Sequence, residues 1–366
     1  MSCSGCVQGR TMLAVVVATI SVLSGCVTVG HRAIQSSRTD YNMALRQTED
    51  EQLLLNLVRL RYRDRPFFLE ATALNTQFSY VSSADGSIGF GSGVPTAVGV
   101  GGKVAFEETP TVTYIPLQGA DYVTRIMSAV PIETMVLLDS SGWSTERVLR
   151  VCVQRMNDLD NASRAGGPTP LEAPEFETFV RAARLLRELE LQGGVEGAKR
   201  RVGGNTEVVL SFSPAVRDTP AFGEFTRLLE LDPAADAFVL SPRPDSGGDT
   251  RISLRPRSFA GVLYFLSQAV EVPQADVEAG RVTVTRDADG NVFDWTRVTA
   301  GLMRIRSNGS PPANAAVAVQ YRGSWFFIDD SDLDSKSTFS MLAQLYSLQA
   351  GGSAGLTPVL TLPVGN

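Results

Sequence analysis

Histidine and cysteine are nearly absent from this chain of 366 residues, which carries one histidine and four cysteines. His31 stands in a polar stretch near the N-terminus, and no second histidine is available to act as a catalytic base beside a serine or cysteine. Nucleophilic triads need such a base, and structural zinc sites need several histidines or cysteines. We therefore expect a protein that is not an enzyme and that holds no metal and no cofactor.

An excess of basic charge is missing as well. The chain has 33 basic and 39 acidic residues, a formal net charge of −6 at pH 7. Tight binding to nucleic acid depends on neutralising phosphates with Lys and Arg, so we expect no nucleic-acid partner. The hydrophobic content of 43% is enough to build real cores, and the length suggests two domains.

No apolar run is long enough for a transmembrane helix. The most apolar segment, from Met12 to Leu23, is twelve residues long, whereas a spanning helix needs about 20. Arg10 precedes this segment and small residues follow it, the order that is typical of an export signal. We therefore predict that residues 1–25 are a cleaved signal peptide.

The signal ends in Leu23-Ser24-Gly25-Cys26, which resembles the lipobox of bacterial lipoproteins. The resemblance implies cleavage between Gly25 and Cys26 and acylation of Cys26, which would then begin the mature chain. Val27 follows the cysteine where an aspartate would suggest retention in the inner membrane. The expected location is the periplasmic face of the outer membrane, with several acyl chains as the membrane anchor.

Cysteine usage after cleavage leaves no possible intramolecular disulfide. Cys3 and Cys6 leave with the signal peptide and Cys26 is acylated, so Cys152 is the remaining thiol. Val148 and Met156 flank it at helical spacing, which predicts a buried small side chain rather than a redox centre.

Periodicity predicts an α+β fold, with two domains of antiparallel sheet and packed helices after the signal peptide and tether. A helix is expected from Asp40 to about Arg63, with leucines on one face, and a period of two follows from Phe67 to about Leu117. A stretch rich in glycine and proline ends at Pro170 and suggests a linker. The expected divisions are a tether at 26–39, an N-terminal domain at 40–160, a linker at 161–175 and a C-terminal domain at 176–366.

A glycine-rich β-hairpin at residues 87–107 is the most unusual pattern in the chain. Apolar residues alternate with small ones in both expected arms, which turn around Pro95-Thr96-Ala97; the apolar positions are Ile88, Phe90, Val94, Val98, Val100, Val104 and Phe106. One interpretation is a soluble hairpin laid over a core, with its bare face close to another backbone. The other is a hairpin that enters the membrane within a closed ring of subunits, with Lys103 and the glycines lining the lumen.

Four aspartates between Asp329 and Asp334 form the only acidic cluster that resembles a calcium loop. Ser335 and Met341 stand where an EF-hand needs Gly and Glu, so we assign these acids to the N-terminus of the last helix.

The function we expect is that of an outer-membrane lipoprotein, a structural or assembly subunit of a cell-envelope complex. Its partners would be the membrane, through the lipid anchor, and envelope proteins or further copies of itself. The alternatives are a lipid-tethered periplasmic enzyme and a ligand-binding lipoprotein. A deep polar pocket would favour the first alternative and a large apolar cavity the second.

Overall fold

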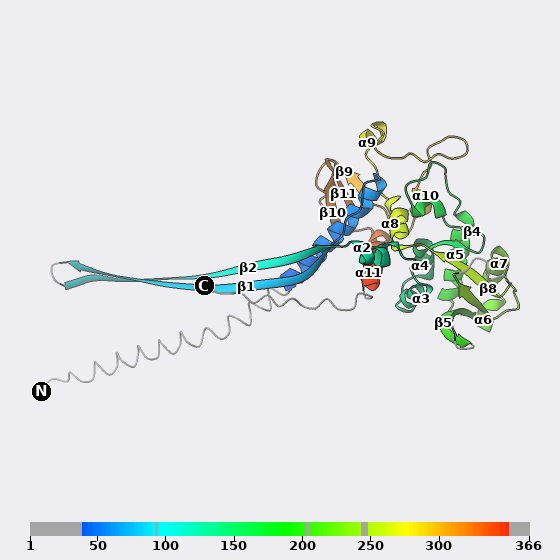
Figure 1. The fold of residues 1–366 in the computed structure, drawn as a ribbon, viewed down its shortest axis with the longest axis horizontal. Coiled ribbons are helices and arrows are strands. Elements are labelled where there is room, and N and C mark those ends of the chain that lie inside the picture. Colours follow the sequence, from blue (N-terminus) through cyan, green and yellow to red (C-terminus); the bar gives the residue numbers. More distant parts are fainter. Residues whose placement is uncertain (1–38, 92–93, 203–204, 243–247, 351–366) are drawn as a thin grey trace.

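A long two-stranded ribbon projects from a body of helices and two further sheets (Figure 1). The computed structural model describes residues 39–91, 94–202, 205–242 and 248–350. The ribbon is made of β1 (Leu69–Gly91) and β2 (Val94–Pro116), each 23 residues long. Everything described after Pro116 belongs to the body, together with the helix at residues 39–61.

The larger body sheet has six strands in the order β4-β3-β8-β7-β6-β5. The strands are β3 (Val153–Met156), β4 (Leu159–Asp160), β5 (Val195–Val202), β6 (Asn205–Phe212), β7 (Ala237–Ser241) and β8 (Arg251–Pro256). All neighbours are antiparallel except β7 and β8, which are parallel.

The smaller body sheet has the order β10-β11-β9 and is antiparallel throughout. Its strands are β9 (Arg306–Asn308), β10 (Ala315–Tyr321) and β11 (Ser324–Asp329). Arg322 and Gly323 join β10 to β11 with φ of 50° and 85°. Two consecutive positive φ values are typical of the tight hairpin turn that matches the twist of the strands.

Helices surround both body sheets and supply much of one continuous core. They are α2 (Gly119–Tyr122), the π-helix η1 (Val123–Met127), α3 (Ile132–Ser140), α4 (Thr145–Cys152), the 3₁₀ helix η2 (Ser163–Gly166), α5 (Glu177–Leu191), α6 (Pro214–Arg217), α7 (Pro220–Leu228), α8 (Phe259–Ser267), α9 (Gln274–Glu278), α10 (Thr296–Thr299) and α11 (Leu333–Ala350). With segregated helices and mainly antiparallel sheets, the α+β fold class is confirmed.

The helix at residues 39–61 lies on the body along the root of the ribbon (Figure 1). Leu53, Leu54, Leu57 and Leu60 are at most 5% exposed. They repeat at the three- and four-residue spacing of one helix face, so the predicted apolar face is the face that packs.

Residues 161–175 are packed into the body and do not form a free linker. Ala162 and Ala165 are fully buried, and Asn161 donates to the carbonyls of Arg150 at 2.9 Å and Val153 at 2.6 Å. Strand β3, before this segment, pairs with β8, after it. One sheet therefore draws strands from both sides of the expected boundary, because pairing partners are set by tertiary contacts that glycine and proline content does not reveal.

Candidate membrane hairpin and its attachment

The ribbon of β1 and β2 is much longer than the hairpin expected at 87–107. Within the described residues, β1 and β2 pair with each other and with no other strand. An extended strand rises about 3.3 Å per residue, so arms of 23 residues reach about 75 Å. The ribbon projects away from the body (Figure 1), and within the described residues no body strand pairs with it.

The turn lies closer to the first arm than the sequence analysis expects. Strand β1 runs to Gly91 and β2 begins at Val94, so Pro95 stands inside β2 near its start. Proline is tolerated near a strand end because the lost N–H costs little there. Val94 therefore belongs to the second arm, where it is paired with Gly91.

The register sets which residues are opposite one another in the ribbon, and the sequence puts mainly apolar residues at one alternating set of these positions and mainly polar or small ones at the other. Opposite residues share a face, and the pairs Ile88↔Val98, Gly86↔Val100, Ser82↔Val104 and Tyr80↔Phe106 all lie on the same one, as does Phe90 by alternation. Leu74, Phe78 and Val112 fall on this face too. The other face carries mainly polar and small residues, among them Asn75, Gln77, Ser79, Ser83, Asp85, Ser87, Gly99, Gly101, Lys103, Glu107, Thr109, Thr111 and Thr113. Six of the seven expected apolar positions share one face. Val94 does not, because it is paired with Gly91, beyond the register shift at Gly89 and Phe90.

Aromatic residues stand at two levels of the apolar face. Tyr80 is opposite Phe106, with Phe78 two residues nearer the body, and Phe90 lies close to the tip. The ten residue-to-residue steps from Tyr80 to Phe90 span about 33 Å of strand. At a tilt of about 40° this is a height of about 25 Å, which matches the apolar band of transmembrane strands between their aromatic girdles. The aromatic level at Tyr80 and Phe106 was not predicted, because the first arm was expected to begin near Ile88, although residues alternate with period two from Leu74 onward.

Two amide side chains fasten the start of β1 to the helix at residues 39–61. Gln52 accepts from the backbone N–H of Leu69 at 2.6 Å and donates to its carbonyl at 3.1 Å. One turn later, Asn56 makes the same pair of contacts with Phe67, both at 2.9 Å. Residues four apart share a helix face, and residues two apart share a strand face. The helix thus satisfies two successive positions of the entering strand.

A charged cluster completes the root of the ribbon. Glu70 of β1 forms an ion pair with Arg125 of η1, whose side chain is 6% exposed. Tyr346 of α11 donates to Glu70 at 3.1 Å, and the Arg125 guanidinium lies 5.2 Å from the centre of its ring. Burial, and then the charge of Glu70, raises the pKa of Tyr346, so its hydroxyl stays protonated and remains a donor. Phe68 stacks on the same ring at 5.5 Å.

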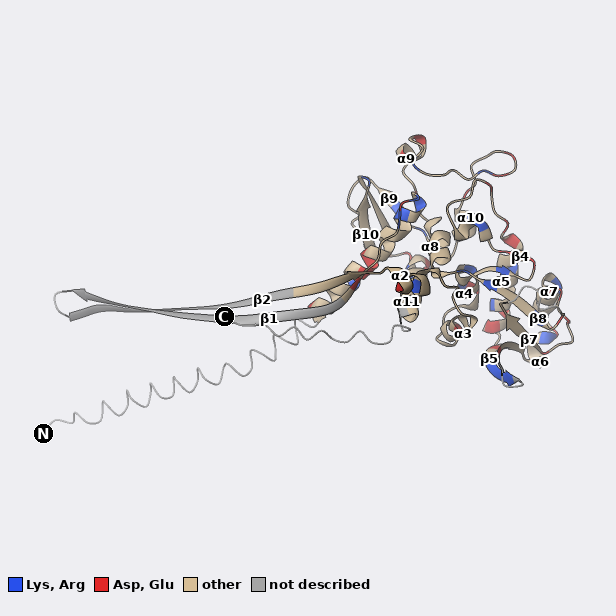
Figure 2. Cartoon of the chain, in the orientation of Figure 1, with Lys and Arg blue, Asp and Glu red and all other residues tan. Residues whose placement is uncertain are grey.

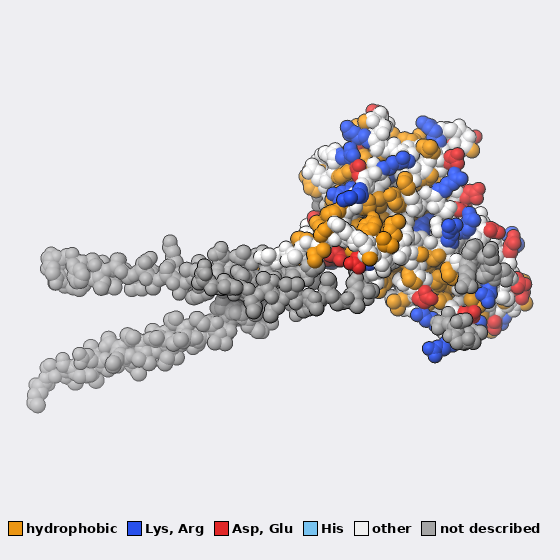
Figure 3. All heavy atoms as spheres, in the orientation of Figure 1, with side chains coloured by type: hydrophobic (Ala, Val, Ile, Leu, Met, Phe, Trp, Pro, Cys, Tyr) orange, Lys and Arg blue, Asp and Glu red, His pale blue; other side chains and the backbone are white. Residues whose placement is uncertain are grey.

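A groove of about 440 Å³ opens at this root, lined by the helix at 39–61, both strands, η1 and α11. Its wall carries Asp50, whose pKa is raised by partial burial and only partly lowered again by Arg46 at 3.7 Å. Apolar side chains are exposed on the face of the body near the place where the ribbon leaves it (Figure 3). Tyr114 and Ile115 at the end of β2 and Val123 and Met127 of η1 are each 46–58% exposed. Charges of both signs are mixed over the body (Figure 2), so no face of a single sign is seen there.

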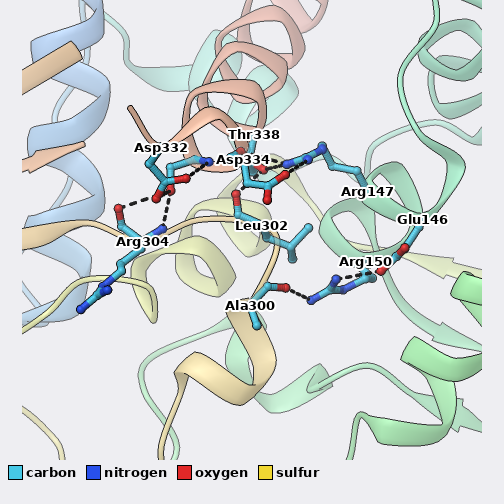
Figure 4. A network of polar contacts seen from close by, with 10 residues as sticks. Glu146, Arg147, Arg150, Ala300, Leu302, Arg304, Asp332, Asp334 and Thr338 are labelled. Carbon is cyan, nitrogen blue, oxygen red and sulfur yellow. Dashed lines mark hydrogen bonds and ion pairs between the residues drawn. The ribbon is translucent and has the colours of Figure 1, made fainter. Parts of the chain in front are cut away.

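The acidic cluster before α11 stabilises that helix and its neighbours. Asp332 accepts from the Ser335 N–H at 3.0 Å and hydroxyl at 2.7 Å, while Asp334 pairs with Arg147 at 2.7 Å (Figure 4). The expected role at the helix N-terminus is thus confirmed for Asp332. The helix begins at Leu333, directly after this cap. No group of three or more potential metal ligands was found within the described part of the chain.

Two further expectations concern cysteines. Cys152 is fully buried, and burial raises the pKa of its thiol to about 12, which agrees with a packing role. Gly25 and Cys26, the expected cleavage and lipidation residues, lie outside the described residues. Across the described ranges, none of the helices is both long enough and apolar enough to cross a bilayer.

Comparisons with known proteins give no family for this chain. No protein-family model, no curated protein and no solved structure matches it.

Proposed function

We propose that this protein is a lipid-anchored subunit of an outer-membrane complex, in which several copies insert their hairpins side by side as one closed ring. The observation that carries the proposal is the ribbon of β1 and β2, in which both arms place their apolar residues on the same face. A structural or assembly role in the cell envelope follows, with other copies of the chain as the first partners.

The ribbon is longer than the strand length that a membrane crossing requires. The segment between the two aromatic levels is tall enough for the apolar band, which is about 25 Å high. The remaining ten or so residues toward the body include Thr109, Thr111 and Thr113 on the polar face and Asn75 and Gln77 opposite them. These polar residues suit a portion of the ring that stands above the membrane in the periplasm.

The requirement for a ring follows from hydrogen bonding. Among the described residues, each arm pairs only with the other, so the outer edge of each arm offers its N–H and C=O groups to another strand. In hydrocarbon each such unpaired group costs several kcal/mol, so a single hairpin would not stay inserted. Edge-to-edge pairing with neighbouring copies satisfies both edges when the ring closes.

The expected anchor is compatible with this arrangement. The N-terminal end of the helix at 39–61 lies toward the side on which the ribbon projects (Figure 1). The thirteen residue-to-residue steps from Cys26 to Thr39 can reach at most about 45 Å. Acyl chains on Cys26 would therefore sit in the membrane that the ribbon enters.

The anchor is tested by labelling cells with palmitate. Wild-type protein should incorporate the label, and Cys26→Ser should not incorporate it and should remain uncleaved or free in the periplasm. Labelling of Cys26→Ser would overturn the lipoprotein assignment.

Insertion is tested with two aspartate substitutions on opposite faces of β2. Val100→Asp puts a charge on the apolar face, while Ala105→Asp puts the same charge on the polar face. In a mild detergent extract examined by electron microscopy, wild type and Ala105→Asp should form rings, and Val100→Asp should not. A monomeric wild-type extract, or rings in Val100→Asp, would refute the proposal.

A further inference from the structure

A pocket of about 390 Å³ opens in the body, and no ribbon residue lines it. Its walls are the end of the helix at 39–61, the residues that follow α8, α10 with the residues on either side of it, and the start of α11. Figure 4 shows residues from one side of the pocket, where Ala300, Leu302 and Arg304 lie near Asp332 and Asp334. Sites for small molecules measure about 300–1,000 Å³, so this pocket has the size of a site for a small ligand.

Two buried side chains of the pocket have a polar atom without a hydrogen-bond partner. Arg61 is 9% exposed and Gln268 is 3% exposed. Within the described residues, no partner is found for Nε of Arg61 or for Oε1 of Gln268. The two side chains are neighbours, because both donate to the Thr169 hydroxyl, Arg61 at 3.3 Å and Gln268 at 3.2 Å. Buried polar atoms are nearly always paired, so this unpaired donor and this unpaired acceptor indicate a bound group.

The unpaired atom of Gln268 is identified as an oxygen by the bond that the other end of the amide makes. The amide nitrogen of Gln268 donates to the Tyr264 carbonyl at 3.2 Å. A carbonyl oxygen only accepts, so the nitrogen belongs on that side and the oxygen is the atom left unpaired. A ligand group that satisfies Gln268 is therefore a hydrogen-bond donor.

Arg61 also lacks a partner of opposite charge. Its guanidinium donates to the Thr169 hydroxyl and, at 3.2 Å, to the Thr283 carbonyl, and no carboxylate pairs with it in the part of the chain that the structure describes. Burial lowers the pKa of Arg61 to about 10, so the side chain is still charged at neutral pH. A buried charge without a counterion is unfavourable. A ligand group that satisfies Arg61 is therefore an anion, and a carboxylate matches the forked geometry of the guanidinium.

The other charged residues that line the pocket form an acidic rim. They are four acids and one arginine, and all are more exposed than Arg61. Each has a partner of its own: Glu271 pairs with Arg304, Asp334 pairs with Arg147, Asp332 accepts from Ser335, and Asp294 accepts from Thr296. The excess of acids in this rim favours a positively charged group on the ligand.

We infer that the pocket binds a short peptide, with the terminal carboxylate on Arg61, a peptide N–H on Oε1 of Gln268 and the ammonium group at the acidic rim. A dipeptide carries all three of these groups. The inference does not depend on the proposed ring, because every residue in it belongs to the body. It gives the body a binding role in addition to supporting the ribbon.

The inference is tested by isothermal titration calorimetry of the full-length protein in mild detergent, with L-alanyl-L-alanine as the probe. Wild type should give saturable binding. The C-terminal amide of the same dipeptide lacks the carboxylate and should bind at least about tenfold more weakly. Sodium acetate has the carboxylate but neither the N–H nor the ammonium group, and it should also bind at least about tenfold more weakly. Equal affinity for the dipeptide and its amide, or no saturable binding of the dipeptide, would overturn the inference.

Two arginine substitutions separate recognition of the carboxylate from support of the fold. Arg61→Gln should weaken binding of the dipeptide at least about tenfold, because the carboxylate loses its charged partner. Arg63→Gln is the matched control, because Arg63 donates to the Thr169 carbonyl at 3.2 Å but does not line the pocket. Its affinity for the dipeptide should equal that of wild type. Equal losses in the two variants would mean that contact with Thr169, and not a charge in the pocket, controls binding, and the inference would fail.

A third substitution tests the acceptor. Gln268→Glu places a carboxylate beside Arg61, where it competes with the carboxylate of the ligand. The affinity for the dipeptide should fall at least about tenfold, while circular dichroism should show the same fold as wild type. Unchanged affinity in Gln268→Glu would mean that the ligand does not reach Arg61 and Gln268, and it would overturn the inference.

Discussion

The body and the ribbon differ in how many strands share their backbone hydrogen bonds. In the body, six strands lie side by side and share one core with their helices. In the ribbon, β1 and β2 pair only with each other among the residues that the structure describes. An isolated two-stranded hairpin is at best marginally stable in water. The body strands therefore have neighbours in sheets of three and six strands, whereas no third strand extends the ribbon within the described residues.

The largest effect should follow from removing a buried cation in the body. The fully buried Arg257 donates to the carbonyls of Arg150, Val151 and Val153 at 2.7–3.1 Å and to that of Asn161, and it lies 4.0 Å from the Phe265 ring. Arg257→Met should lower the free energy of unfolding by about 3–5 kcal/mol, because buried acceptors lose their donor. Urea denaturation followed by circular dichroism measures this loss.

The control for Arg257 is an exposed arginine in an ion pair. Arg164 and Glu172 are 2.8 Å apart, and their side chains are 70% and 79% exposed. Arg164→Ala should change stability by less than about 0.5 kcal/mol. Equal losses in the two variants would mean that the carbonyl cluster around Arg257 does not stabilise the body.

An intermediate effect is expected where the ribbon meets the body. Asn56 is fully buried, and Asn56→Leu keeps its shape while leaving the N–H and C=O of Phe67 without partners. The expected loss is about 1–3 kcal/mol. Gln47→Leu is the matched control, because Gln47 is exposed and its side chain donates to Glu51, one turn along the same helix. If hydrogen exchange at Phe67 and Leu69 is as slow in Asn56→Leu as in wild type, the amide pairing is not what holds β1.

A smaller effect should depend on pH. The pKa of Asp50 is raised in the folded protein, chiefly by burial, so ionisation of Asp50 costs stability when the pH is above the folded pKa. This cost shrinks as the pH falls through the folded pKa and vanishes below the unfolded pKa of about 4. Asp50→Asn should therefore raise Tm slightly at pH 7 and leave it unchanged below about pH 3.5. A higher Tm for wild type at pH 7 would reverse the sign of this prediction.

The smallest effect on the body should come from the ribbon itself. Residue 100 lies far along a strand that pairs with no body strand. Val100→Asp should thus leave the unfolding free energy of the body within about 0.5 kcal/mol of wild type, even though it should prevent ring formation. A large loss of body stability would show that the two regions fold as one unit, and the comparison between them would fail.

Local pattern was enough to predict several elements of this protein. The leucines at three- and four-residue spacing predicted the face of the helix at 39–61. Period two from Phe67 to about Leu117 predicted the β region that became the ribbon. These signals are local because helix and strand geometry place residues a few positions apart on one face.

The sequence predicted the alternation in the candidate hairpin but not the position of its turn. The alternation around Val98 to Phe106 marked a two-faced strand, but the turn could be placed beside any of several glycines and prolines. If the turn moves by one residue, the residues of the second arm change face relative to those of the first. The residues that share a face therefore follow from the pairing of the two strands, which the sequence alone does not give. Likewise, no local pattern predicts that Gln52 and Asn56 bond the backbone of residues 17 and 11 positions further along the chain.

The sequence by itself determined the secondary structure of the ribbon, the polarity of its faces and, through the resemblance at Cys26, the expectation of a lipid anchor. Only the tertiary structure decided that the ribbon stands free of the body and that β3 joins β8 across residues 161–175. It also decided that Arg257 holds carbonyls from a distant segment. The physical reason is that periodicity records which face of an element is apolar. The choice of partner for that face, or for a free strand edge, depends on contacts between residues far apart in the chain.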